Sequence, residues 1–196
     1  MKIFDMKDFD RNKVLPFALS AFIVLADQIV KAIVVANIPL FGAHVRPIEP
    51  LGNDFLWIIH VRNPAIAFSI GHNLPETIRP ALFVILPLVV LGFLLWYYFK
   101  SNEFTNLQRW VVAGIVGGGI GNIIDRIFRP DGVVDFVSVK FYGILGFDRW
   151  PTFNVADASV VVSCIILIFS IFSGNFGNIK NSKHARKEEA LNEQKS

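Results

Sequence analysis

The 196-residue sequence is too apolar for a soluble domain of this size: 53% of its residues are hydrophobic, 18% are charged, and its mean hydropathy is +0.50. A small domain has too much surface to hide that many apolar side chains in one core, so lipid must solvate many of them. The net charge of +3 is too small to indicate a nucleic-acid partner, and a single cysteine, Cys164, excludes an internal disulfide.

Four apolar stretches are long enough to cross a bilayer as helices, which takes roughly 20 residues each. They cover residues 16–37, 78–99, 107–128 and 155–176. The runs are continuous and do not alternate with polar residues, which predicts helices and not barrel strands. Acidic residues precede the first run and no small-residue cleavage site follows it, so we expect a retained span and not a signal peptide.

Basic residues predict the orientation of these spans. They precede the first span and follow the fourth, and Lys100 and Arg109 bracket the short connection between the second and the third. Because basic flanks stay in the cytoplasm, we expect both termini on the cytoplasmic side of the membrane. The two longer connections, 38–77 and 129–154, then face outward.

The outward connections are expected to form a small sheet and an interfacial loop. In the first connection, prolines and glycines separate candidate strands at 45–48, 56–61 and 65–70. The second connection combines glycines with aromatic residues, which suit the membrane interface. The sequence therefore predicts an all-α membrane fold of four transmembrane helices with a small outward-facing sheet.

We expect one membrane domain, residues 1–177, followed by a polar and disordered tail at 178–196. The four histidines lack the spacing of zinc ligands, so the sequence implies neither a metal nor another cofactor. These histidines are His44, His60, His72 and His184.

Charged residues inside the spans require an explanation, because each costs about 2.5–3.5 kcal/mol on insertion scales. In the first span Asp27 and Lys31 lie four residues apart, on one helical face, where they can form an ion pair. The third span contains glycines at small-x-x-x-small spacing, which predicts close helix packing and not a nucleotide site. These glycines pair as Gly114 with Gly118 and Gly117 with Gly121.

More ionisable groups follow the glycines. Asp125 and Arg126 end the third span, Asp135 lies inside the apolar segment Gly-Val-Val-Asp-Phe, and Asp157 opens the fourth span. The predicted topology places all three carboxylates near the outer surface. Lys31 and Arg126 could neutralise only two of the four aspartates in or near the spans.

Unneutralised carboxylates at one depth support more than one chemistry. Two of them in a low-dielectric site would share a proton and could act as the general base and general acid of an aspartic peptidase. The same groups could serve a small proton-coupled membrane transporter, or could only hold helices together.

Five motifs, in order and spacing, resemble the signal peptidase II family of lipoprotein signal peptidases from bacterial inner membranes. The first is Asp27-Gln28-Ile29-Val30-Lys31, and the second begins Arg62-Asn63-Pro64-Ala65. The others are Gly121 to Arg126, Val133 to Phe136 and Phe153 to Asp157. They cover residues 27–162 of the chain.

The resemblance implies an aspartic endopeptidase that cuts prolipoproteins just before a diacylglyceryl-modified cysteine, with Asp135 and Asp157 as its catalytic pair. It implies further residues that line the site or hold substrate, namely Asn63, Asn122, Arg126 and Asn154. It also implies supporting roles for Asp27, Lys31 and Asp125. We expect a four-helix fold with a small β-cradle and a site near the outer face of the inner membrane. Membrane lipids and the lipidated prolipoprotein are the expected partners of a monomer.

The sequence departs from the family pattern at one position. Ala65 stands two residues after Asn63, where the family commonly has glycine. Glycine reaches backbone angles that alanine does not easily adopt, so the turn after Asn63 is expected to differ in this chain.

Overall fold

The computed structural model describes residues 10–64, 78 and 81–172, and every structural statement below concerns those residues. Within them, four helical segments are long and apolar enough to cross a membrane. These are Arg11–Asn37, Leu82–Lys100, Asn106–Phe128 and Val155–Phe172. The four predicted spans are thus confirmed. The expected end of the last span at 173–176 and the tail at 178–196 lie outside the described residues.

The first helical segment is divided by a proline. A short helix α1, Arg11–Val14, is capped by Asp10, and α2, Phe17–Asn37, begins after Pro16. Proline lacks a backbone N–H and crowds the preceding turn, so a helix restarts at this position more easily than it continues through it.

The two central helices begin with different sequence signals. Helix α3, Leu86–Lys100, follows a π-helical turn, η3, Ala81–Ile85, and has proline in its first turn, where no N–H is needed. Helix α4, Asn106–Phe128, starts with a capping box in which Thr105 and Gln108 satisfy each other's backbone N–H groups.

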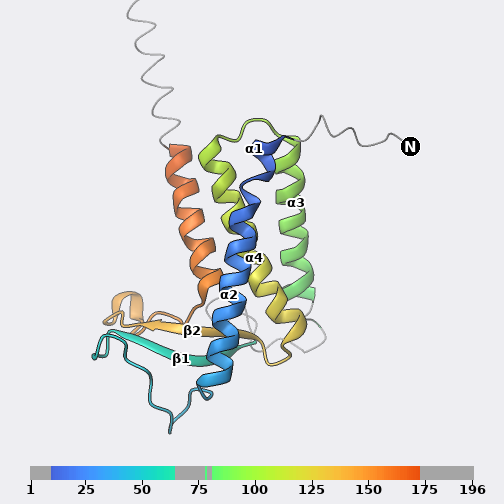
Figure 1. The fold of residues 1–196 in the computed structure, drawn as a ribbon. Helices are drawn as coiled ribbons and strands as arrows, with labels where there is room; N and C mark the ends of the chain where they lie inside the picture. Colours follow the sequence, from blue (N-terminus) through green and yellow to red (C-terminus); the bar gives the residue numbers. More distant parts are fainter. Residues whose placement is uncertain (1–9, 65–77, 79–80, 173–196) are drawn as a thin grey trace, which may run out of the picture.

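The helices pack side by side with the sheet at one end (Figure 1). Helices α2 and α4 run toward the sheet, and α3 and the last helix, Val155–Phe172, run away from it. The short connection at 101–105 lies at the opposite end. The two long connections therefore share one side of the molecule, as the topology predicted.

The glycines of α4 allow this close packing. A Cβ at Gly117 would lie 2.9 Å from Ser20 Cα of α2, and one at Gly118 would lie 2.7 Å from Val160 Cγ2 of the last helix. Because real Cβ atoms do not approach other atoms that closely, each position requires glycine, and the predicted packing role of these glycines is confirmed.

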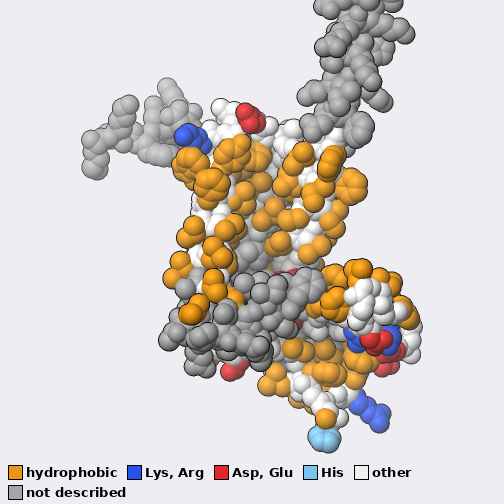
Figure 2. All heavy atoms as spheres, turned by 180° about the vertical axis from the view of Figure 1, so that it is seen from behind, with side chains coloured by type: hydrophobic (Ala, Val, Ile, Leu, Met, Phe, Trp, Pro, Cys, Tyr) orange, Lys and Arg blue, Asp and Glu red, His pale blue; other side chains and the backbone are white. Residues whose placement is uncertain are grey.

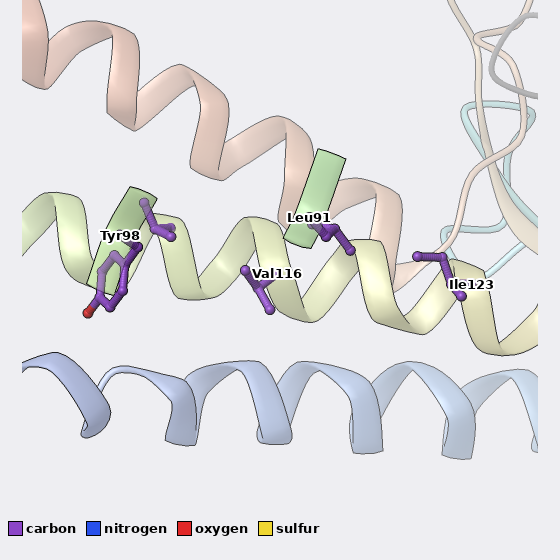
Figure 3. Packing of buried hydrophobic residues seen from close by; sticks show 5 residues of the cluster. Leu91, Tyr98, Val116 and Ile123 are labelled. Atoms are coloured by element: carbon purple, nitrogen blue, oxygen red, sulfur yellow. The ribbon is translucent and has the colours of Figure 1, made fainter. Parts of the chain in front are cut away.

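Helices α3 and α4 meet through larger side chains. Leu91 and Tyr98 of α3 pack against Val116 and Ile123 of α4 (Figure 3). Tyr98 is fully buried, and its hydroxyl donates a hydrogen bond to the Lys13 carbonyl oxygen (2.8 Å), which ties α3 to the start of the chain.

The outer surface of the helices is apolar, as lipid contact requires. Figure 2 shows hydrophobic side chains over the helices and charged ones mainly at the two ends. Large side chains such as Phe22, Phe93 and Phe169 are about two-thirds exposed, at 67%, 65% and 68%. Water would solvate such side chains poorly, and a hydrocarbon phase solvates them well.

The sheet consists of two antiparallel strands, β1, Leu56–Asn63, and β2, Val133–Val139. The register shifts between Ile58 and Val61, so that Ile59 and His60 lie opposite one residue of β2. Such a β-bulge adds one residue to a strand and re-aims the neighbouring side chains. Here both Ile59 and His60 are buried, which strict alternation would not allow.

The structure corrects the predicted strands in part. The strand expected at 56–61 is confirmed, whereas the one expected at 45–48 is wrong, since only an isolated bridge joins Ile48 to Ile58. Pro47 has no N–H for a ladder, which disfavours a strand there. The candidate strand at 65–70 lies outside the described residues. Strand β2 was not predicted, because its apolar run pairs with a segment some seventy residues away.

Candidate active site

Asp157 lies in the first turn of the last helix, where Asn154 caps the helix. The backbone N–H of Asp157 donates to Asn154 Oδ1 (2.9 Å), and the backbone N–H of Asn154 donates to Asp157 Oδ2 (3.2 Å). This reciprocal pair has the form of a capping box, built from Asn and Asp. The local sequence Asn-Val-Ala-Asp thus fixes the position of the Asp157 carboxylate.

Asn154 also ties the start of this helix to β2. Its Nδ2 donates to Asp135 Oδ1 (2.7 Å) and to Asn122 Oδ1 (3.1 Å), while Asn122 Nδ2 donates to Asp157 Oδ1 (2.7 Å). Asn154 is completely buried. Asn154 and Asn122 thus link the two carboxylates through one chain of hydrogen bonds, and the structure brings these four predicted site residues together.

Asp135 lies near the middle of β2 and is only 2% exposed. Asn63 Nδ2, from the end of β1, donates to its Oδ2 (3.0 Å). Burial raises the pKa of Asp135 from 3.8 to about 7, and the negative charge of Asp157 raises it as well, although both amides and Lys31 act in the opposite direction. A carboxyl group with this pKa can hold a proton at neutral pH, as a general acid must.

Glycine at position 132 lets β1 and β2 approach each other beside Asn63. Gly132 has φ +103°, and a Cβ there would lie 2.7 Å from the Pro64 nitrogen. Neither the backbone angle nor the space suits another residue. Ala65, where the sequence departs from the family pattern, lies outside the described residues.

Lys31 is the centre of a buried polar network under the two strands and the last helix. Its Nζ contacts Asp27 Oδ2 (2.8 Å), Asp125 Oδ2 (3.1 Å) and Asn122 Oδ1 (3.1 Å). The Lys31, Asp27 and Asp125 side chains are 0% exposed. The predicted ion pair within the first span is confirmed, and it extends to the third.

Each supporting aspartate accepts a hydrogen bond from the backbone just before a predicted catalytic aspartate. The N–H of Ala156, which precedes Asp157, donates to Asp27 Oδ1 (3.0 Å). The N–H of Val134, which precedes Asp135, donates to Asp125 Oδ2 (3.0 Å). Since Lys31 joins the two supporting carboxylates, one network of buried charges sets the relative position of both chain segments.

Sequence reasoning missed two members of this network, Gln28 and Arg129. Gln28 Nε2 donates to Asp125 Oδ1 (2.9 Å) and to the Gly121 carbonyl oxygen (3.1 Å), and its Oε1 accepts from Arg129. Arg129 also forms an ion pair with Asp125. The i,i+4 spacing of Asp125 and Arg129 at the end of a helix was the signal that could have identified this pair.

The sequence offered Arg126 as a partner that could neutralise one of the aspartates, but Arg129 takes this role at Asp125. Arg126 is half-buried, and in the described part of the chain it forms no ion pair or hydrogen bond. The carboxylates that act on its charge are Asp157, Asp135 and Asp125, with Asp157 first. Lys31 and Arg129 pair with the two supporting aspartates, so Arg126 is the positive charge near Asp135 and Asp157 that these ion pairs leave over.

Comparisons with known proteins agree with this arrangement. The family model for signal peptidase (SPase) II matches residues 19–173. A lipoprotein signal peptidase of Treponema pallidum (strain Nichols) is 41% identical over 183 residues, which are 93% of this chain and 92% of that protein. The lipoprotein signal peptidase of Treponema denticola is 46% identical over 147 residues, which are 75% of this chain and 82% of that protein.

A solved bacterial membrane enzyme structure has the same fold. It matches with a TM-score of 0.67 at 25% identity, over 81% of this chain and 88% of its own. The family model covers most of the chain, including every described motif that pointed to the site. The chain therefore belongs to the signal peptidase II family and is a multi-pass bacterial membrane protease that cleaves signal peptides from prolipoproteins.

Proposed function

We propose that Asp135 and Asp157 hydrolyse the peptide bond just before a diacylglyceryl-modified cysteine, using one water molecule and one shared proton. The observation that carries this proposal is that the single residue Asn154 donates hydrogen bonds to both carboxylates, to Asp135 from its side chain and to Asp157 from its backbone. Two carboxyl groups held this close in a site of low polarity resist joint ionisation, so one keeps a proton.

We assign the donor role to Asp135, which is the more deeply buried of the two carboxyl groups, and the role of base to Asp157. Asp157 takes a proton from water, the water oxygen bonds to the carbonyl carbon, and Asp135 gives its proton to the carbonyl oxygen. When the tetrahedral intermediate collapses, the proton on Asp157 passes to the amide nitrogen, the C–N bond breaks, and the re-forming carbonyl returns a proton to Asp135. The products are a signal peptide with a new carboxyl terminus and a lipoprotein with a free amine on its cysteine.

Polar side chains around the pair are assigned to substrate binding. Arg126 lies near the two carboxylates and can donate to substrate carbonyl oxygens, and Asn63 is assigned to the substrate site because it contacts Asp135. Asn122 and Asn154 orient the carboxylates themselves. Asp27 and Asp125 act as positioning residues, because they accept hydrogen bonds from the backbone beside the pair, and Lys31 acts with them because it joins their two carboxylates.

The position of the site suits a substrate that arrives through the bilayer. The carboxylates gather at one end of the helices, beside the sheet, and do not form a path along the helix axes, which disfavours the transporter alternative. We propose that this end faces outward from the inner membrane, with both termini in the cytoplasm. Residues 1–177 would then form one monomeric enzyme domain.

The proposal is tested with purified protein in detergent and a diacylglyceryl-modified prolipoprotein. Asp135→Asn and Asp157→Asn should each lower signal-peptide release by at least 10²-fold, since each removes a general acid or base. Asp131→Asn is the matched control, because Asp131 is an exposed aspartate four residues before Asp135.

Thermal unfolding must show that all three variants are folded. Full activity of either folded variant, Asp135→Asn or Asp157→Asn, would remove that residue from the catalytic pair. Asp125, which lies in the same network, would then be the next aspartate to replace.

A further inference from the structure

The connection between β2 and the last helix ends in an apolar tip, which we define as residues 141–147. The tip turns through the short 3-10 helix η4, Ile144–Gly146. Its side chains are unusually exposed for their type: Leu145 is 80% exposed, Tyr142 70% and Ile144 55%. Large exposed apolar groups gathered on one segment indicate contact with another apolar phase.

A rigid polar base supports the tip. Backbone hydrogen bonds close it, from Phe141 N to the Asp148 carbonyl oxygen (2.8 Å) and from Gly143 N to the Phe147 carbonyl oxygen (2.9 Å). Below them, Lys140 contacts the carboxylates of both Asp148 and Asp54 (3.0 Å each). The tip is therefore held in place from its base.

Arg149 extends this base into the sheet. It donates to Ser138 Oγ (2.8 Å) and to Asp54 Oδ1 (3.0 Å), and its guanidinium lies 3.6 Å from the centre of the Trp57 ring. Such contacts fix the direction in which the tip projects from the cradle.

The backbone of the tip keeps its apolar side chains outside. Tyr142 and Leu145 have φ values of 54° and 55°, in the left-handed region that side chains other than those of glycine, asparagine and aspartate disfavour. These two are also the most exposed side chains of the tip. If these apolar side chains only had to avoid water, they would be expected to turn inward. Their outward position therefore indicates an apolar partner that they contact.

The tip lies where that partner can be lipid. In Figure 1 it is the light-orange loop on the helix side of β2, at the left end of the sheet. Figure 2 shows that the lobe projecting from the sheet has hydrophobic side chains on the side toward the helices and charged ones on the opposite side. The apolar side of the lobe thus faces the level of the membrane that the helices would span.

We propose that residues 141–147 insert into the bilayer leaflet at the sheet end of the helices. The aliphatic side chains of Ile144 and Leu145 enter the acyl region, and Tyr142 lies at the headgroup level, where aromatic side chains are favoured. The tip is part of the connection that joins the strand of Asp135 to the helix of Asp157. Its insertion would hold the sheet against the membrane surface, whatever reaction the site performs.

The test measures the depth of a nitroxide label in the full-length protein, reconstituted in vesicles of phosphatidylethanolamine and phosphatidylglycerol. Cys164→Ser removes the native thiol, and Leu145→Cys carries the label. Ala43→Cys is the matched control, because Ala43 is an exposed cradle residue in the loop that Figure 1 shows farthest from the helices. Oxygen, which concentrates in lipid, and a neutral nickel chelate, which stays in water on both sides, serve as relaxing agents.

We expect the Leu145 label to relax mainly with oxygen and the Ala43 label mainly with the nickel chelate. Equal, water-like accessibility of both labels would overturn the proposal. A Leu145 label that neither reagent reaches would also overturn it, because the tip would then be packed against protein. The vesicles need no substrate, so the result is independent of the proposed reaction.

Discussion

Three buried charged residues, Asp27, Lys31 and Asp125, lie beside Asp135 and Asp157. Backbone hydrogen bonds explain why they are there. Asp27 and Asp125 each receive the N–H that precedes one member of the pair, and Lys31 holds the two supporting carboxylates together. Removing one partner from such a network leaves an uncompensated buried charge, which costs about 3–5 kcal/mol. At the scale of single residues, position and stability are therefore linked.

The raised pKa of Asp135 predicts the pH dependence of the reaction. A pKa of about 7 means that the group holds its proton below pH 7 and loses it as the pH rises through that value. Because the proposed donor must be protonated, kcat/KM should fall roughly tenfold per pH unit on the alkaline side. A profile from pH 5 to pH 9 in one detergent measures this. A flat alkaline limb to pH 9 would show that no group with a pKa near 7 supplies the essential proton.

Replacing each of the two arginines at the end of α4 should have a different effect on stability and on activity. Arg129→Gln should lower the free energy of unfolding by about 1–3 kcal/mol, because it removes charged hydrogen bonds to a buried carboxylate. Arg126→Gln should leave stability nearly unchanged, but should lower kcat/KM on the order of 10²-fold by removing a charge beside the pair.

Thermal unfolding and peptide release, measured on both variants, separate these effects. The interpretation of the two arginines would be wrong if Arg126→Gln lost as much stability as Arg129→Gln. It would also be wrong if the two variants lost activity equally at equal stability.

At the scale of helices, close packing of α4 positions the start of the last helix. Gly118 lies against the backbone of Ala156, the residue before Asp157. A Cβ added at Gly121 would lie 2.9 Å from Asp27 Oδ2. The glycines that let helices approach each other thus also set the distance between the supporting network and Asp157, one of the two proposed catalytic aspartates. The bulge in β1 has a comparable role on the other side, since it lies next to the residue paired with Asp135.

Two glycine-to-alanine variants test this role of packing. Gly118→Ala should lower stability by about 1–3 kcal/mol and reduce activity, because the new methyl group meets the Ala156 backbone and Val160. Gly92→Ala is the control in α3: no atom lies within 4 Å of its added Cβ, so the better helix propensity should leave stability equal or higher. Equal stability of the two variants in detergent would show that α4 is not closely packed at Gly118.

At the scale of the whole molecule, the described parts of the two long connections lie at one end of the helices, together with the sheet that carries Asp135 (Figure 1). The basic residues of the chain predict that this end faces away from the cytoplasm. A lipid-linked substrate can then reach the carboxylates from the side, through the bilayer, and water reaches them at the interface.

Single cysteines in a Cys164→Ser background test this orientation in intact cells. An impermeant maleimide should label Ala43→Cys, in the long connection after α2, and should label Glu103→Cys, in the short connection, only after the cells are opened. Both positions are exposed, so accessibility across the membrane decides the result. Labelling with the opposite pattern would reverse the proposed topology.

Much of this protein is determined by its sequence alone. The four spans follow from continuous apolar runs of sufficient length, because helices satisfy their own backbone within each run. The Asp27–Lys31 pair and the Asn154–Asp157 cap are also local, since both partners lie within one helical turn. The motif order was sufficient to suggest the family, which the comparisons then showed.

Only the tertiary structure decided which charges are paired. Asp125 could have used Arg126 or Arg129, and the choice depends on how α4 meets Gln28 of α2, far away in the sequence. Strand β2 likewise exists because β1 supplies its hydrogen-bonding partner, and no local pattern records that pairing. Long-range contacts of this kind depend on the packing of distant segments. The motifs implied a place in the site for Arg126, but only the folded chain showed that Arg129 pairs with Asp125.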